Sequence, residues 1–146
     1  MIDIFFDTSV LVAASISTHQ HHAQALPAVQ RVVSKKDRGF ISNHALAEMF
    51  AVLTRLPVIP RLHPTEVMRM VTDTVLPHFQ TVPLTQHDYL EAISMMEAGG
   101  WRGGKIYDAL HLRCAAKSKA ERIYTFNVRD FRALAPLELQ KKICAP

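Results

Sequence analysis

The sequence predicts an α/β fold of three layers, in which helices cover both faces of a central, mostly parallel sheet of four to five strands. The chain opens on a short apolar run typical of a strand buried on both faces, made of Ile2, Ile4, Phe5 and Phe6. Strand patterns then alternate with helical patterns along most of the chain, which implies right-handed crossovers and parallel strands. With 146 residues, the chain is predicted to form one domain, 1–146, with a sizeable core.

The individual elements follow from local patterns. In chain order we expect strands at 2–6, 40–42, 79–84 and 123–126, and helices at about 10–13, 26–33, 45–53, 65–75, 86–99 and 105–116; a short helix then opens at 130, and 137–143 forms a last strand or turn. Glycine and proline end these units or bend the chain at Gly39, Pro57, Pro60, Pro64, Pro83, Gly99 and Gly100. The helices on either side of the first three prolines are expected to form a hairpin-like projection, and Pro83 places the third strand at its end or at a sheet edge.

Composition and charge exclude several classes of protein. The content of 49% hydrophobic residues with five glycines is that of a compact chain, not a disordered or fibrous one. No apolar run approaches the roughly 20 residues of a membrane span, and no signal-type segment opens the chain. We therefore expect a cytoplasmic protein without a membrane partner. Cys114 and Cys144 lack a C-x-x-C spacing, so both are interpreted as reduced packing residues, with no structural zinc.

The net charge of +4 is unevenly distributed. Residues 101–146 carry ten Lys or Arg against four acids, a net of +6, whereas residues 1–100 carry a net of −2. A positive field of this kind can attract a polyanion such as RNA, but a solvated basic surface without a partner explains the count equally well.

Asp7 follows the first strand at once and is succeeded by Thr8 and Ser9. In parallel sheets, ligands gather just beyond the carboxyl ends of the strands, which favours a functional carboxylate here. Asp, Ser and Thr are also good helix caps, so Asp7 capping the next helix is the alternative.

The helix at 45–53 is apolar apart from Glu48. A helix apolar on every side is predicted to be buried, and a buried carboxylate needs a partner. A long-range salt bridge and a shared cation are the two explanations for Glu48.

The helix at 105–116 places Asp108 and His111 on one face, among apolar residues. Asp108 is also favoured in a first turn by the helix dipole. His111 could bind substrate or hydrogen-bond to Asp108, although a histidine on an apolar face is more often a core residue. Three histidines between Ser17 and His22 have no cysteine or carboxylate beside them, so we interpret that segment as a solvated helix start.

These acids are expected to converge at one sheet edge. Asp7 and Asn127 follow strands, while Glu48 and Asp108 occupy early turns of helices that face the same edge. Carboxylates, a polar fourth ligand and nearby hydroxyls make a hard oxygen site suited to Mg²⁺ or Mn²⁺. Such ions activate water and stabilise charge during phosphodiester displacement.

These residues resemble the motifs of the PIN-domain family. They occur in the same order as in that family and span nearly the whole chain. The matching stretches are Asp7-Thr8-Ser9, Glu48 in an apolar helix, Asp108-Ala109-Leu110-His111, and Thr125-Phe126-Asn127 followed by Asp130-Phe131. A chain of this size looks like the toxin of a VapBC-type toxin–antitoxin pair. The resemblance implies a PIN-like fold and a metal-dependent endoribonuclease that is homodimeric and inhibited by a small antitoxin whose tail enters the acidic cleft.

Carried over by position, the resemblance assigns catalysis and metal binding to Asp7, Glu48 and Asp108, with Thr8, Ser9 and Thr125 as supporting residues. The family's fourth acidic position is Asn127 here, which lacks charge, so a second metal ion would bind more weakly unless Asp130 reaches in.

Two further hypotheses compete with a ribonuclease that holds RNA phosphates with basic residues of 101–146. A weakly catalytic RNA-binding or regulatory module is motivated by Asn127. A phosphate-transferring domain with Asp7 as nucleophile is disfavoured. Hydrolases of the haloacid dehalogenase type have an Asp where Ser9 stands, and the acidic pair and lysine of receiver domains are missing. No Walker-type glycine-rich loop is present either, which disfavours nucleotide hydrolysis.

Overall fold

One sheet of five parallel strands organises the computed structural model, which describes residues 1–146. The strands stand in the order β3-β2-β1-β4-β5, with bounds β1 (Asp3–Phe6), β2 (Arg38–Ser42), β3 (Phe79–Val82), β4 (Arg122–Tyr124) and β5 (Ile143–Cys144). The central strand β1 pairs in parallel with β2 and β4. The predicted parallel sheet is therefore confirmed, and β3 lies at an edge, as Pro83 indicates.

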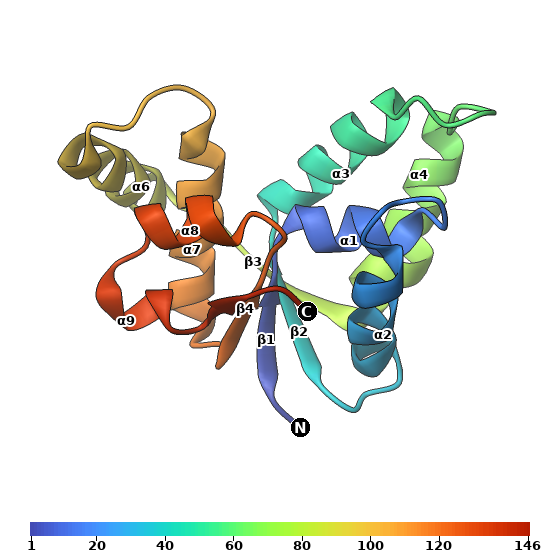
Figure 1. Cartoon of the computed structure of the whole chain (residues 1–146), viewed down its shortest axis with the longest axis horizontal. Coiled ribbons are helices and arrows are strands. Elements are labelled where there is room, and N and C mark those ends of the chain that lie inside the picture. The colour runs from blue at the N-terminus through green and yellow to red at the C-terminus, as the bar shows by residue number, and fades with distance from the viewer.

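Helices cover both faces of this sheet. Figure 1 shows α1 (Thr8–Ser15), α2 (His22–Val33), α3 (His44–Arg55) and α4 (Pro64–Met70) on one side, and α6 (Gln86–Gly99), α7 (Lys105–Ser118), α8 (Val128–Leu134) and α9 (Leu137–Gln140) on the other. A π-helical turn, η1 (Val71–Val75), and the short α5 (Leu76–His78) connect α4 to β3. The three-layer α/β/α architecture is thus confirmed.

The alternation of side chains along β1 divides the core in two. Ile4 and Phe6 belong to the apolar cluster under α1 to α4, whereas Phe5 belongs to the cluster under α6 to α8. Successive residues of a strand point to opposite faces, so a strand covered on both sides is apolar throughout. All three side chains are at most 1% exposed.

Several boundaries differ from the sequence prediction. β2 begins at Arg38, so Gly39 lies inside the strand instead of ending the previous unit. A Cβ at Gly39 would meet the ring of Phe79 at 2.5 Å and the side chain of Val32 at 2.8 Å, so only glycine fits at this position. The segment 137–143 forms the short helix α9 before β5 begins, and the helix predicted at 65–75 is divided into α4 and η1.

The helix α3 departs most from expectation. Its buried residues are Ala45, Met49 and Leu53, which share one face, whereas Phe50 is 46% and Val52 39% exposed. The prediction that this helix is buried on every side is wrong, because α3 packs against α1 and α4 and nothing covers its outer face. The hairpin-like pairing of α3 with α4 is confirmed (Figure 1).

Two smaller observations complete the fold. None of the helices combines the length and apolar character that crossing a bilayer requires. Both cysteines are free; Cys114 is buried, which raises the pKa of its thiol to about 11, and Cys144 is partly buried.

Candidate active site

Asp7 lies at the carboxyl end of β1, directly before α1. Its side chain is almost fully buried and accepts hydrogen bonds from the hydroxyls of Ser9, at 2.6 Å, and Thr125, at 2.8 Å. Asp7 occupies the N-cap position of α1, yet its side chain caps no backbone amide. The capping alternative for Asp7 is therefore wrong, and hydroxyl groups from two separate segments hold its carboxylate.

Asp108 stands in the first turn of α7 and is partly buried. Burial and the negative charge of nearby Asp7 raise the pKa of Asp108 to about 6. None of the main influences on this pKa is a hydrogen bond. The carboxylate of Asp108, which has no hydrogen-bond partner and lies near the charge of Asp7, is in an arrangement that a bound cation relieves.

Glu48 is held by two histidines. Its Oε1 lies 2.5 Å from Nε2 of His111 and 3.3 Å from Nε2 of His44, one turn earlier on α3. Partial burial works against the charged form of Glu48, but the hydrogen bond and charge of His111 outweigh it and lower the pKa of Glu48. Of the two explanations for this acid, the long-range ion pair is therefore seen, although its partner is a histidine.

His111 connects two of the three acids. Its side chain is fully buried, and Nε2 lies 3.9 Å from Oδ1 of Asp7 while it contacts Glu48. Burial disfavours its charge, but the hydrogen bond to Glu48 and the charge of Asp7 leave the pKa of His111 raised. The hydrogen bond to Asp108 considered from the sequence is replaced by one to Glu48, because α3 and α7 meet at this point.

Thr125 and Ser9 tie the loop after β4 to Asp7. Thr125 Oγ1 donates to Asp7 and accepts from the backbone N–H of Asn127 at 3.0 Å, while Ser9 Oγ accepts from the N–H of Phe126 at 3.2 Å. Two of the three predicted supporting hydroxyls, those of Ser9 and Thr125, are thus engaged with the acid, whereas Thr8 Oγ1 has no hydrogen-bond partner. Asn127 itself is exposed and reaches the same cavity.

A cavity of about 370 Å³ opens beyond the carboxyl ends of β1 and β4. Its lining combines the predicted acids with hydroxyl, amide and imidazole groups: Asp7, Thr8, Ser9, Val12, His19, Gln20, His21, Glu48, Val52, Asp108, Phe126 and Asn127. Six of the eight site residues expected from the sequence therefore line the cavity, and a seventh, Thr125, lies behind it with its hydroxyl bonded to Asp7.

Asp130 is the exception. It does not line the cavity, its side chain is 56% exposed, and its Oδ1 pairs with Nζ of Lys105 at 3.7 Å. Asp130 contributes only its charge, which helps to raise the pKa of Asp108.

The histidine segment was misjudged from the sequence. His19, Gln20 and His21 form part of the cavity wall, and both histidines are partly buried instead of being a solvated helix start. His44 was also missed, although its spacing of four residues before Glu48 places the two side chains on one helix face. No local pattern predicts His19 or His21, because the fold of the α1–α2 connection brings them to the sheet edge.

The donor groups fit a hard divalent cation, although no three His, Cys, Asp or Glu side chains lie close enough together to enclose one. Asp7 and Asp108 offer carboxylate oxygens to the cavity, and Thr8 Oγ1, also in its lining, is buried without a hydrogen-bond partner. Mg²⁺ keeps several waters and is commonly held by one or two carboxylates. Glu48, engaged by two histidines, is therefore not required as a direct ligand.

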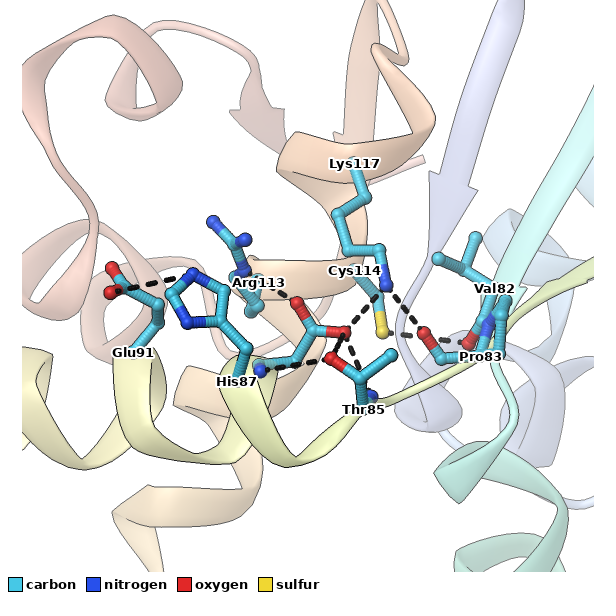
Figure 2. Close-up of polar contacts among 9 residues, drawn as sticks. Val82, Pro83, Thr85, His87, Glu91, Arg113, Cys114 and Lys117 are labelled. Carbon is cyan, nitrogen blue, oxygen red and sulfur yellow. Dashed lines mark hydrogen bonds and ion pairs between the residues drawn. The ribbon is translucent and has the colours of Figure 1, made fainter.

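A second buried acid lies outside this cavity. Asp88, 2% exposed in the first turn of α6, accepts from Arg113 Nε at 2.8 Å, Lys117 Nζ at 2.5 Å and the backbone N–H of Thr85 at 2.9 Å. Figure 2 shows Arg113 and Lys117 of α7 directed toward the start of α6, beside Thr85. Burial raises the pKa of Asp88, but these partners outweigh it and hold the pKa far below its usual range.

A parallel α/β sheet with carboxylates and hydroxyls gathered beyond its carboxyl edge defines a class of domain that binds ligands at that edge, here with donors suited to a hard cation. Comparison with known proteins makes the class specific. The PIN domain model matches residues 4–136, and the chain belongs to the PIN domain family.

Individual relatives agree with this assignment. The chain is 33% identical to Ribonuclease VapC27 of Mycobacterium tuberculosis over 127 residues. The matched region covers 87% of this chain and 84% of that protein. Its fold is similar to that of Mycobacterium tuberculosis VapC20, described as a sarcin-ricin loop cleaving toxin, with a TM-score of 0.70, 21% identity, and 93% and 98% of the two chains covered. It is also similar to VapBC2 from Rickettsia felis bound to a DNA fragment from the promoter, with a TM-score of 0.65, 17% identity, and 99% and 98% covered.

Proposed function

We propose that this protein is a metal-dependent endoribonuclease that hydrolyses RNA phosphodiesters with Mg²⁺ or Mn²⁺, and that it is the toxin of a VapBC-type toxin–antitoxin pair. The observation that carries the proposal is the cavity at the carboxyl edge of the sheet, where Asp7, Asp108 and Glu48 meet. Membership of the PIN domain family and the similarity to VapC27, a protein named as a ribonuclease, support RNA as the substrate.

Each side chain at the cavity has a separate role in the proposed reaction. Asp7 and Asp108 would hold the metal ion, which supplies an activated water and stabilises charge on the phosphate. Ser9 and Thr125 fix the Asp7 carboxylate by hydrogen bonds. His111 and His44 fix Glu48, whose lowered pKa keeps it ionised as a hydrogen-bond acceptor at the cavity wall. Asn127 offers a carbonyl oxygen without charge, so a second cation would be held more weakly.

The proposal includes the partners. A small antitoxin is supported by the fold similarity to VapBC2, and an acidic cavity without lysine or arginine suits the entry of a basic antitoxin tail. A homodimer in the cytoplasm belongs to the same proposal.

The test is cleavage of a mixed RNA pool by antitoxin-free wild type and the Asp7→Asn variant, each with Mg²⁺, Mn²⁺ or EDTA. We expect cleavage by the wild type with metal only, and none by the variant. Cleavage that persists in EDTA, or that Asp7→Asn leaves unchanged, would contradict the proposed roles of Asp7 and the metal.

A weakly catalytic RNA-binding module is the second candidate. It is favoured by Asn127 at the position of the fourth acid and by the pairing of Glu48 with His111. This candidate predicts salt-dependent RNA binding without metal-dependent turnover. Asn127→Asp would then raise cleavage above the wild-type level, whereas robust wild-type cleavage eliminates the candidate.

A further inference from the structure

Two imidazole rings lie flat against aromatic rings beside the acidic cavity. The ring of His21, just before α2, is parallel to that of Phe126, just after β4, with centroids 4.3 Å apart and planes at 11°. The ring of His44, at the start of α3, is parallel to that of Tyr107, in the first turn of α7, at 5.1 Å and 5°. Each stack joins segments that are distant in the chain, so tertiary packing creates both.

Both stacks adjoin the acids. His21 and Phe126 line the cavity together with Asp7 and Asp108. The second stack is next to the cavity because Tyr107 directly precedes Asp108 and because His44 contacts Glu48. A phosphodiester placed at the carboxylates would therefore lie close to two aromatic surfaces.

The ring of Tyr107 is accessible to a ligand, and the other three rings are partly exposed, although Phe126 also packs against the core cluster under α1 to α4. Tyr107 is 49% exposed, and it belongs to neither of the two apolar core clusters. The side chain of His44 is 22% exposed, and His21 and Phe126 are only partly buried. Burial in the core therefore does not account for the Tyr107–His44 stack.

The charge of the cavity adds a second argument. Its lining holds three carboxylates and no lysine or arginine, so the basic residues of 101–146 would hold RNA phosphates outside the cavity. Affinity for RNA at the acids must then come from a cation and from contacts to the bases. Bases of a single strand stack on aromatic side chains with little dependence on sequence, whereas bases in a duplex are unavailable.

We propose that the His21–Phe126 and His44–Tyr107 stacks bind nucleobases next to the phosphodiester at the carboxylates. The inference rests on the proposed ribonuclease function for the position of the phosphodiester, but base binding itself is measurable without cleavage.

The experiment measures binding of a fluorescent single-stranded RNA pool, by anisotropy with Mn²⁺, in the Asp7→Asn background so that the RNA stays intact. Tyr107→Leu removes the ring, Tyr107→Phe keeps it, and Tyr89→Leu removes a tyrosine of similar exposure on α6, away from the cavity. We expect Tyr107→Leu to weaken binding by about 5- to 100-fold, with Tyr107→Phe and Tyr89→Leu close to the parent. The same RNA hybridised to its complement, or carrying abasic nucleotides throughout, should bind the parent no better than single-stranded RNA binds Tyr107→Leu.

The outcomes separate this inference from the proposed function. Equal binding by Tyr107→Leu and Tyr107→Phe, or equal binding of normal and abasic strands, overturns the inference, even if the wild type cleaves RNA. A ring-dependent loss of binding supports it, even if the wild type cleaves nothing and the ribonuclease proposal fails.

Discussion

The single helix α7 serves two acidic clusters that are built in opposite ways. Near its end, Arg113 and Lys117 neutralise Asp88, whose pKa is held far below its usual range. Near its start, Asp108 faces the charge of Asp7 without a hydrogen bond, and its pKa is raised to about 6. A buried acid with all its partners links the elements that supply them. An acid without a partner is destabilising until a ligand binds it, which is typical of a functional site.

The largest effect is expected from Asp108→Asn at the unpaired cluster. If Asp108 holds the metal ion as proposed, its loss should lower the RNA cleavage rate by about 1,000-fold or more, because such an ion contributes several kcal/mol to stabilising the transition state. The same change removes charge repulsion with Asp7, so the thermal midpoint of unfolding in EDTA should stay the same or rise. An inactive but strongly destabilised variant would instead give Asp108 a structural role like that of Asp88.

At Asp88, which is paired with Arg113 and Lys117, a substitution is expected to lower stability and leave cleavage unchanged. Asp88→Asn leaves Arg113 and Lys117 without a charged partner, and should lower the free energy of unfolding by about 3 kcal/mol, measured by urea denaturation at pH 7. Cleavage per folded molecule should stay near the wild-type level, because these contacts lie outside the cavity.

The pH dependence gives Asp88 a second readout. Because its pKa is lowered by folding, its contribution to stability is complete above the usual pKa of about 4 and is lost as the pH falls toward the folded value. The difference in stability between wild type and Asp88→Asn should therefore be constant above about pH 5 and shrink below pH 4. A difference that stays constant down to about pH 2 would show that the charge of Asp88 is unimportant.

A smaller effect on cleavage is expected at Glu48, the cavity acid that, like Asp88, has a partner. His111→Leu removes the donor to Glu48 and should reduce cleavage by about 10- to 100-fold, the range for residues that orient metal-site groups. Stability in EDTA should fall, but by less than in Asp88→Asn, because Glu48 keeps His44 as a partner and the variant also removes the buried Nδ1 that has none. His111→Gln, which can still donate to Glu48, should recover part of the activity; if it behaves as His111→Leu does, orientation of Glu48 is not the role of His111.

Much of this arrangement could be predicted from local pattern. Asp7 follows an apolar strand and Asp108 opens a helix, and parallel topology brings the ends of such elements to one sheet edge. Whether Asp130 reaches into the site was left open by the sequence; in the structure it lies in the first turn of α8 and pairs with Lys105.

The rest depended on contacts between elements. Neither the pairing of Glu48 with His111 nor the closure of Asp88 by Arg113 and Lys117 has a sequence signature, since each joins helices whose relative rotation is set by packing. The same holds for His21, which appeared solvated in the sequence but stacks on Phe126 in the cavity wall.

The sequence by itself determined the order of strands and helices, the parallel sheet and the edge at which the acids gather, because periodicity and chain position encode these locally. The tertiary structure alone decided that α3 is buried on one face, that Glu48 has a histidine partner, and which rings flank the cavity. The physical reason is that burial and side-chain pairing across elements depend on how the surfaces pack together, which no single segment specifies.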